Sequence, residues 1–244
     1  MDKTSLGDRM KGYEAVSNSK LIRRMPVIIR LDGKAFHTWT RQLRAVDESL
    51  DIEPYGNMMH AFMADTVTYL MNNIQNAVFA YSQSDEISIL LNDWKKLNTD
   101  QWFNGKIQKI TSVSASMATV GFNENRSRLS PMPLSPALFD ARVFNLPKEE
   151  VVNYFVWRQQ DATRNSIQML GQFYFSHKRM HGKNVSQIQD MLMEEHQVNW
   201  NDIDTRKKRG FCVYPFNGSG FYDKEIPIFT QDRDFIERFL EADE

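Results

Sequence analysis

Three acidic residues occupy positions where a rigid scaffold would hold them still. Asp32 follows a short β-rich run, and Asp85 and Glu86 lie in a turn between two further β-rich runs. If these strands are neighbours, Asp32 and Asp85 converge at one edge of a sheet, and hard carboxylate oxygens arranged in this way suit Mg²⁺. Two such ions stabilise the attacking and leaving oxygens of an in-line phosphoryl displacement. The pattern predicts metal-dependent nucleotidyl transfer, and the alternative is ordinary turn chemistry, because Asp-Gly and Ser-Asp-Glu are common in turns.

A phosphate-binding segment is predicted directly after Asp32. Glycine lets the backbone pass close to a ligand, and successive N–H groups can form an anion-binding nest. The segment consists of Gly33, Lys34, Ala35, Phe36 and His37. Further along, Lys106 and Lys109 lie three residues apart on one face of a predicted helix. They could bind phosphate or simply form a solvated face.

The elements that must position these residues follow a recognisable order. Apolar periodicity predicts strands at 26–32, 77–81, 87–91 and 139–146, and helices at about 54–74 and 103–119. This βαββαβ order predicts an α+β fold, in which helices cover one face of an antiparallel, ferredoxin-like sheet. Helices at about 148–170 and 184–196 follow. We expect a catalytic core over 1–145 and a helical and C-terminal elaboration of the same domain over 146–244.

Composition narrows the class of protein. The 244 residues are 41% hydrophobic and carry a formal net charge of −1, so disordered and fibrous proteins are excluded and no global basic field indicates nucleic acid. The average hides an asymmetry, because the chain before Tyr222 carries a net charge of +4. The single cysteine, Cys212, excludes an internal disulfide framework. With no apolar run of about 18 residues to span a bilayer, the sequence predicts a cytoplasmic protein with no membrane partner.

Four stretches resemble, in order, the tRNA-histidine guanylyltransferase family, the 3′-to-5′ polymerases that add nucleotides to the 5′ end of tRNA. They are RLDGKAFH at 30–37, YSQSDEIS at 81–88, FDARV at 139–143 and WRQQD at 157–161. The resemblance implies a palm domain like that of 5′-to-3′ polymerases and nucleotide cyclases, in agreement with the βαββαβ order. It also implies GTP, ATP and tRNA as partners and a homotetrameric assembly.

The resemblance implies roles for individual residues. Asp32, the Gly33 carbonyl and Asp85 would hold two Mg²⁺ ions, and Glu86 would support catalysis. The nucleotide would contact the segment from Gly33 to His37 and the residues Ser84, Lys106, Lys109, Arg44 and Asp47. The activated 5′ end would contact the late basic stretch and the helix after the WRQ motif, through Asn165, Lys207, Lys208 and Arg209.

One departure from the family pattern bears on the substrate. Family members that add a non-templated G at position −1 follow WRQ with His-Ile-Asn-Asn, whereas this chain has Thr163-Arg164-Asn165-Ser166. The difference goes with the bacterial and archaeal type, which prefers template-directed addition to 5′-truncated tRNA, so tRNA repair is favoured. The alternatives are non-templated addition to histidine tRNA, a palm-type nucleotide cyclase and a catalytically silent RNA-binding module.

Aromatic residues next to the WRQ motif have two interpretations. Phe155 and Trp157 could stack on RNA bases or pack in the core, and core packing is the simpler expectation.

Overall fold

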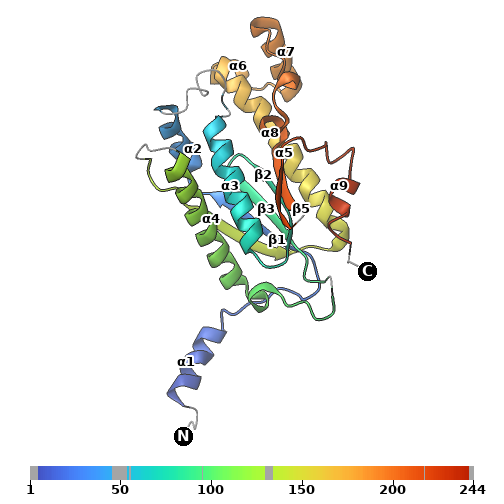
Figure 1. Cartoon of the computed structure of the whole chain (residues 1–244). Helices are drawn as coiled ribbons and strands as arrows, with labels where there is room; N and C mark the ends of the chain where they lie inside the picture. The colour runs from blue at the N-terminus through green and yellow to red at the C-terminus, as the bar shows by residue number, and fades with distance from the viewer. Residues whose placement is uncertain are drawn as a thin grey trace.

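An antiparallel sheet runs through the centre of the molecule (Figure 1). The computed structural model describes residues 5–45, 54, 56–94, 96–129, 134–216 and 218–241. Within these residues the sheet has six strands in the order β4-β1-β3-β2-β5-β6. The strands are β1 (Val27–Gly33), β2 (Ala77–Gln83), β3 (Glu86–Leu91), β4 (Phe139–Asn145), β5 (Phe211–Phe216) and β6 (Ser219–Asp223).

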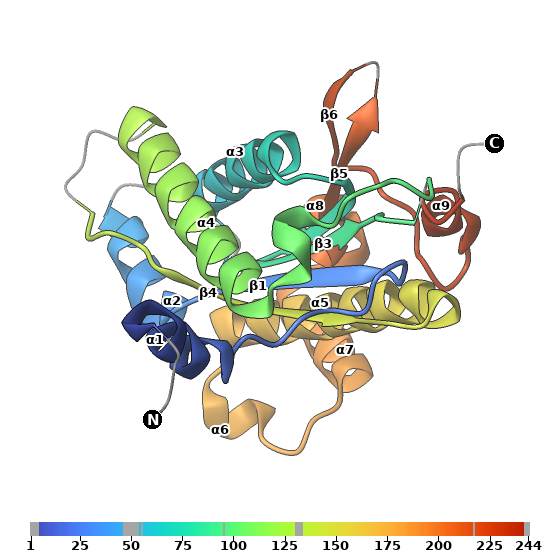
Figure 2. The same ribbon diagram turned by 90° about the horizontal axis from the view of Figure 1, so that it is seen from below.

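Helices cover both faces of the sheet (Figure 2). α3 and α4 lie on one face, and α5 and α9 lie on the other. The helices are α1 (Leu6–Ala15), α2 (Phe36–Trp39), α3 (Asn57–Asn73), α4 (Ile107–Leu129), α5 (Val151–Tyr174), α6 (His177–Met180), α7 (Val185–His196), α8 (Thr205–Arg209) and α9 (Asp234–Glu237).

Strand β1 shows how the side chains are divided between the two faces. Successive residues of a strand point to opposite sides. Ile29 and Leu31 pack with α3 and α4, whereas Ile28 packs in the cluster that includes α5. Arg30 and Asp32 alternate in step with Ile28, so the polar half of β1 belongs to the α5 face. A slip of one residue in register would exchange these two sets.

The βαββαβ order and the α+β class predicted from the sequence are confirmed, but helices on a single face are not. α3 and α4 obey that expectation, and α5 closes the opposite face because its apolar side, including Val151, Val152 and Phe155, packs there. The helix predicted at 103–119 begins later, at Ile107. Phe103 and Asn104 have φ values of 50° and 52°, which an α-helix cannot accommodate.

The last third of the chain contributes more sheet than the sequence predicts. β5 pairs with β2, and β6 pairs with β5, so the expected four-stranded sheet is two strands wider. Cys212 lies in β5 and is buried.

Two parts of the molecule extend away from the sheet (Figure 1). α1 has no buried residue and projects from one end. At the other end, α6 and α7 pack on the last turns of α5 around a third apolar cluster that includes Leu170, Ile188 and Trp200. In the part of the chain that the structure describes, no helix has the length and apolar character needed to cross a membrane.

Candidate active site

Asp32 and Asp85 meet at one end of the sheet. β1 and β3 are antiparallel neighbours, and Asp32 lies opposite Glu86 in their register. The hairpin between β2 and β3 is closed by two residues, Ser84 and Asp85, with Ser84 at a φ of 50°. The Gly33 N–H donates a hydrogen bond of 3.2 Å to the Asp85 carbonyl oxygen, which ties the end of β1 to the hairpin. The convergence predicted from the sequence is thus confirmed for the backbone positions of the two aspartates.

Burial and neighbouring acids raise the pKa of both aspartates. Burial, followed by the charge of Asp32, raises the pKa of Asp85 to about 6. Burial and the neighbouring charge of Glu86 raise the pKa of Asp32. The Ser84 hydroxyl donates a 3.1 Å hydrogen bond to Asp85 Oδ1, and neither aspartate forms an ion pair with any described residue. The charges of Arg30 and Arg142 act on Asp32 in the opposite direction, but they do not cancel the rise in its pKa.

Glu86 has a different environment from Asp85, its immediate neighbour. The sequence placed Glu86 at the hairpin tip, but it is the first residue of β3 and only 4% exposed. Its carboxylate accepts hydrogen bonds from Arg158 Nε at 2.7 Å and Arg158 Nη2 at 2.8 Å, and from Arg30 Nη2 at 2.5 Å. Glu86 therefore ties β1 and β3 to α5, and its oxygens are engaged within the protein.

The segment after Asp32 turns sharply into the short helix α2. A Cβ atom on Gly33 would lie 2.2 Å from the Phe36 ring, so only glycine fits there. Ala35 has a φ of 56°, and its carbonyl oxygen accepts from Thr38 and Trp39. The Thr38 and Trp39 amides are therefore engaged, and the Lys34 N–H donates to the Leu138 carbonyl oxygen at 2.8 Å. The first-turn amides that a helix start leaves outside the internal ladder are those of Phe36 and His37. Lys34, Ala35 and His37 are exposed beside these amides.

Phe36 belongs to the core rather than to an exposed surface. It is 3% exposed and packs against Trp39, Phe122 and Phe139. Its contribution to a ligand is therefore limited to its backbone, which is the role that the sequence suggested for this segment.

Basic residues of α8 lie beside the same end of the sheet. The Tyr81 hydroxyl donates a 2.7 Å hydrogen bond to the Arg209 carbonyl oxygen, and a Cβ on Gly210 would lie 2.3 Å from the Ser82 carbonyl oxygen. These contacts fix α8 against β2, next to the hairpin. Lys207 is mostly covered and lies 3.9 Å from Asp204.

The cations of α8 do not share one orientation. Lys208 is buried, and its Nζ donates to the Asn201 carbonyl oxygen at 2.5 Å and lies over the Trp200 ring. Burial lowers the pKa of Lys208. Arg206 instead reaches α3, where it donates to Asn57 Oδ1 at 3.3 Å. The neighbouring Arg209 is only partly exposed.

Asn165 lies on the exposed side of α5, where its amide donates to Asp161 at 3.4 Å. The same Asp161 accepts from Arg158 at 2.9 Å. Asn165 is therefore linked through Asp161 and Arg158 to Glu86.

Lys106 and Lys109 lie at the opposite end of the sheet from the aspartates. The Gly105 carbonyl accepts from the N–H of Leu21, and both residues line a small cavity with Val27, the first residue of β1, so α4 begins where β1 begins. Asp32 follows five strand residues later, which is a separation of about 17 Å. Lys109 Nζ lies 4.7 Å from the centroid of the Phe103 ring. The two lysines and the aspartates do not form one site within this chain.

The structure does not describe the side chains of two predicted nucleotide-binding residues. Asp47 lies outside the described residues, and Arg44 is described only as part of a 3-10 turn, without its side chain.

A group of side chains that share the α5 face with Asp32 was not predicted from the sequence. Asp140 lies opposite Asp32 on β4, and Arg142 lies opposite Arg30. The alternation of β4 was the available signal, because residues 140 and 142 of an edge strand must share one face. His60 was also missed. It is largely buried on α3, and its burial and the charges of Arg206 and Lys207 lower its pKa to about 4.

The donor set at the aspartates fits Mg²⁺. Among the described residues, no three His, Cys, Asp or Glu side chains converge to hold an ion. Mg²⁺ is usually bound by one or two carboxylates, with water and substrate phosphates completing its shell. The crowded carboxylates of Asp32 and Asp85, with the nearby Gly33 carbonyl, match that pattern, and a cation would relieve their repulsion.

A palm-like sheet with an acidic pair at its end defines a class of nucleotidyltransferases, and comparison with solved structures supports this assignment. A structure described as a bacterial tRNA(His) guanylyltransferase (Thg1)-like protein in complex with ATP has a TM-score of 0.90 and 45% sequence identity, over 97% of this chain and 99% of that one. Another, described as the Thg1-like protein in complex with GTP, has a TM-score of 0.82 and 41% identity, over the same shares.

Sequence comparison identifies the family. The profile described as Thg1, tRNAHis guanylyltransferase, matches residues 7–147, more than half of the chain. A probable tRNA(His) guanylyltransferase from Bos taurus is 27% identical over 197 residues, which are 75% of this chain and 62% of the bovine protein. The chain belongs to the tRNAHis guanylyltransferase family, a family of transferases, and the resemblance noted from its motifs is confirmed.

Proposed function

We propose that this chain is a metal-dependent nucleotidyltransferase that adds nucleotides in the 3′-to-5′ direction to the 5′ end of tRNA. The observation that carries the proposal is the convergence of Asp32 and Asp85, two acids without an ion-pair partner among the described residues, at the end of a palm-like sheet. The ATP and GTP complexes of the similar bacterial structures support both nucleotides as ligands.

In this proposal each part of the site has a task. Asp32, Asp85 and the Gly33 carbonyl would hold two Mg²⁺ ions, which when bound supply positive charge to phosphoryl oxygens. The first-turn amides of α2, with Lys34 and His37 beside them, would bind phosphate. Glu86 would position α5 rather than touch the reacting atoms, because Arg30 and Arg158 occupy its carboxylate.

The proposed reaction has two successive displacements at phosphorus. The 5′-monophosphate of the RNA attacks the α-phosphorus of ATP or GTP, and pyrophosphate leaves. The 3′-hydroxyl of an incoming nucleoside triphosphate then attacks the activated 5′-phosphorus, and the nucleoside monophosphate leaves. The chain would place these groups in line, which is the main requirement when phosphates and cations carry the charge.

Labelled GTP tests the activity. Incubation with a 5′-truncated tRNA should give labelled RNA, and Asp32→Asn or Asp85→Asn should abolish the label while the far-UV circular dichroism spectrum is retained. Asp190→Asn on α7 is a matched control, because it removes the same charge from an exposed residue of the helical extension. Full incorporation by the Asp32→Asn variant would refute the assignment. A cyclic nucleotide formed without RNA would favour a palm-type cyclase instead.

We propose template-directed repair rather than non-templated addition. Support comes from residues 163–166, where Thr163 and Ser166 stand in place of the outer residues of a His-Ile-Asn-Asn motif. Addition should follow the base at position 73 of the tRNA when that template base is varied. Equal G addition opposite all four bases would favour the non-templated activity.

The remaining expectations belong to the same proposal. A homotetramer would cover exposed apolar side chains on α1, where Leu6, Met10 and Tyr13 are 65%, 47% and 75% exposed. Light scattering on the purified chain measures the assembly. A cytoplasmic location accords with the single cysteine, and the proposed division of the chain after residue 145 is tested by limited proteolysis.

A further inference from the structure

Trp157 presents an indole ring to solvent on the α5 face. Its neighbour Phe155 is fully buried, as expected, but Trp157 is 51% exposed, so the expectation of core packing was wrong for this residue. The Arg158 guanidinium lies 4.3 Å from the centroid of the Trp157 ring, and Tyr154 contacts the ring edge-on. Because both supports are buried, the ring is held in place while half of its surface is open.

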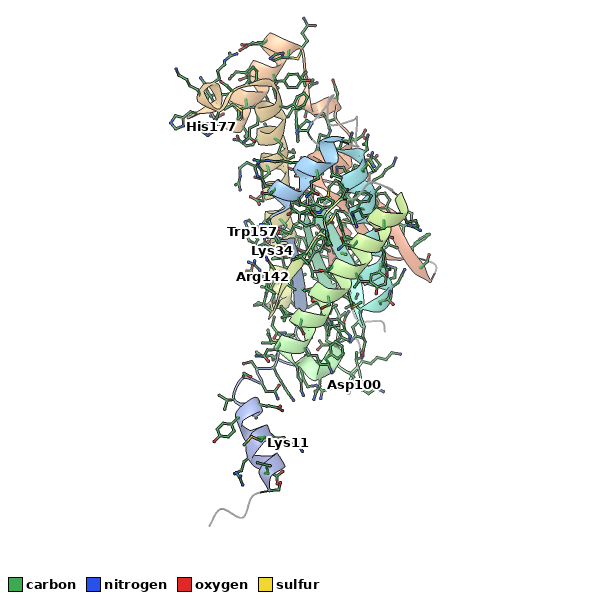
Figure 3. The ribbon with its side chains drawn as sticks, turned by 90° about the vertical axis from the view of Figure 1, so that its left-hand side faces the viewer. Lys11, Lys34, Asp100, Arg142, Trp157 and His177 are labelled. Atoms are coloured by element: carbon green, nitrogen blue, oxygen red, sulfur yellow. The ribbon has the colours of Figure 1, made fainter. Side chains whose placement is uncertain are left out.

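Cationic side chains surround this ring. Arg30 lies 5.9 Å from the Trp157 ring centroid, and Arg142 lies opposite Arg30 in the β1–β4 register. Figure 3 shows Lys34, Arg142 and Trp157 close together along one side of the molecule. The Arg142 side chain is 57% exposed, and Lys34 is exposed.

The acids near these cations differ in how strongly they engage them. Glu86 lies beneath the surface and is engaged by Arg30 and Arg158. Asp140 approaches Arg142 only to 3.8 Å, and an exposed pair of this kind is weak. Asp161 is paired with Arg158 and Arg164, and Asp32 lies within range of the charges of Arg30 and Arg142. The surface around the ring therefore carries the exposed cations Arg142 and Lys34 next to an open aromatic face.

This surface is continuous with the candidate active site. Asp32 and Arg30 alternate in step on β1, and Asp140 and Arg142 do so on β4, so all four lie on the α5 face. Lys34 follows Asp32 by two residues. RNA with its 5′ end at Asp32 would therefore have nucleotides within reach of this surface.

We propose that Trp157, with Arg142 and Lys34, binds an unpaired nucleotide of the RNA strand opposite the reacting 5′ end. The base would stack on the open face of the indole, and the two cations would contact the flanking phosphates. Stacking on aromatic side chains with adjacent positive charge is how proteins hold single-stranded nucleic acid. The inference rests on the proposed function, because it takes tRNA, whose 5′ end lies beside an unpaired 3′ terminus, as the substrate.

Two RNA hairpins test the inference without any nucleotide triphosphate. They share one stem and a 5′-monophosphate, and only one carries four unpaired nucleotides at its 3′ end. Fluorescence anisotropy at fixed salt should show tighter binding of the hairpin with the overhang. Trp157→Ala should weaken that binding about tenfold and leave the blunt hairpin unchanged, whereas Trp157→Phe should retain most of the affinity. Arg142→Gln should reduce the slope of log affinity against log salt by about 0.7 for the overhang hairpin.

The controls separate other interpretations. Phe216→Ala removes a similarly exposed aromatic, 57% exposed, at the far end of β5, and should change neither affinity. Equal affinities of Trp157→Ala and the parent chain for the overhang hairpin, or equal losses for both hairpins, would overturn the inference. A changed oligomeric state of Trp157→Ala in light scattering would assign the surface to a second copy and also overturn it. Failure of the proposed function would appear separately, as an absence of GTP incorporation by the parent chain.

Discussion

Asp85 and Glu86 are adjacent acids for which the structure predicts opposite effects on stability. Glu86 is 4% exposed and holds Arg30 and Arg158 through three hydrogen bonds. Glu86→Gln preserves the shape of the side chain but removes the charge, so the buried guanidinium of Arg158 loses its bidentate partner. Breaking a buried ion pair from one side costs about 3–5 kcal/mol. Since Asp161 also pairs with Arg158, we expect the lower value, about 3 kcal/mol.

Asp85→Asn should instead stabilise the metal-free protein. The pKa of Asp85 is about 6 in the folded chain against an ordinary value of 3.8. The folded state therefore binds this proton more tightly than the unfolded state does, and stability is lost as the pH rises through about 6. Two pH units correspond to about 3 kcal/mol. Asp85→Asn removes the ionised carboxylate, so it should raise the free energy of unfolding by up to this amount at pH 8 and by almost nothing near pH 4.

The assay is urea unfolding in EDTA at pH 8, followed by circular dichroism. In a thermal melt of a chain of this size, the same change of about 3 kcal/mol would shift the unfolding temperature by about 6–12 °C. We expect a lower midpoint for Glu86→Gln and a higher one for Asp85→Asn. Asp140→Asn is the control, because Asp140 forms only a 3.8 Å exposed pair with Arg142 and should change stability by less than about 0.5 kcal/mol. Loss of stability in both test variants would refute the reasoning.

Three further predictions concern other parts of the fold. Gly210→Ala should lower the free energy of unfolding by more than about 3 kcal/mol, because its Cβ would lie 2.3 Å from the Ser82 carbonyl oxygen. Gly182→Ala, at a φ of +75° with open space around it, should lower it by only about 1 kcal/mol. Similar urea midpoints for the two variants would contradict the clash. His60 has a pKa of about 4, so the unfolded chain takes up its proton first as the pH falls below 6.5, and about 3 kcal/mol of stability is lost between pH 6.5 and 4. His60→Gln should flatten stability against pH over that interval, and an unchanged curve would count against the assignment. Mg²⁺ at pH 8 should raise the unfolding temperature of the parent chain but not of Asp85→Asn, and equal shifts would place the ion elsewhere.

Local sequence signals predicted the part of the site that is built from neighbouring strands. The turn at 84–85 and the end of β1 at Gly33 follow from β-rich runs interrupted by turn residues, and antiparallel pairing then brings Asp32 and Asp85 together. Glu86 could not be understood in this way. Its environment is set by Arg158, which lies 72 residues away on a helix, and the sequence does not specify which face of the sheet that helix covers.

The end of the sheet at which a helix begins is a second feature that local sequence patterns do not contain. Helical spacing places Lys106 and Lys109 on one face, but it does not say at which end of the sheet α4 begins. The glycine at 105 and the turn before it set that end, through the contact of the Gly105 carbonyl with Leu21. Trp157 was misjudged for a similar reason, because its exposure depends on the edge strand β4 being left uncovered on that side.

The position of β5 determines when, during synthesis, the sheet can be completed. Both aspartates have been synthesised once residue 85 is added, but β2 acquires its outer neighbour only with residues 211–216, and the basic helix α8 directly precedes them. Nascent chains fold from the N-terminus. Until residues 211–216 are added, a partial product therefore carries an open edge on β2 and lacks the cations of α8. Truncated polypeptides of this kind would offer that edge to strands of other chains, so they would be prone to aggregation.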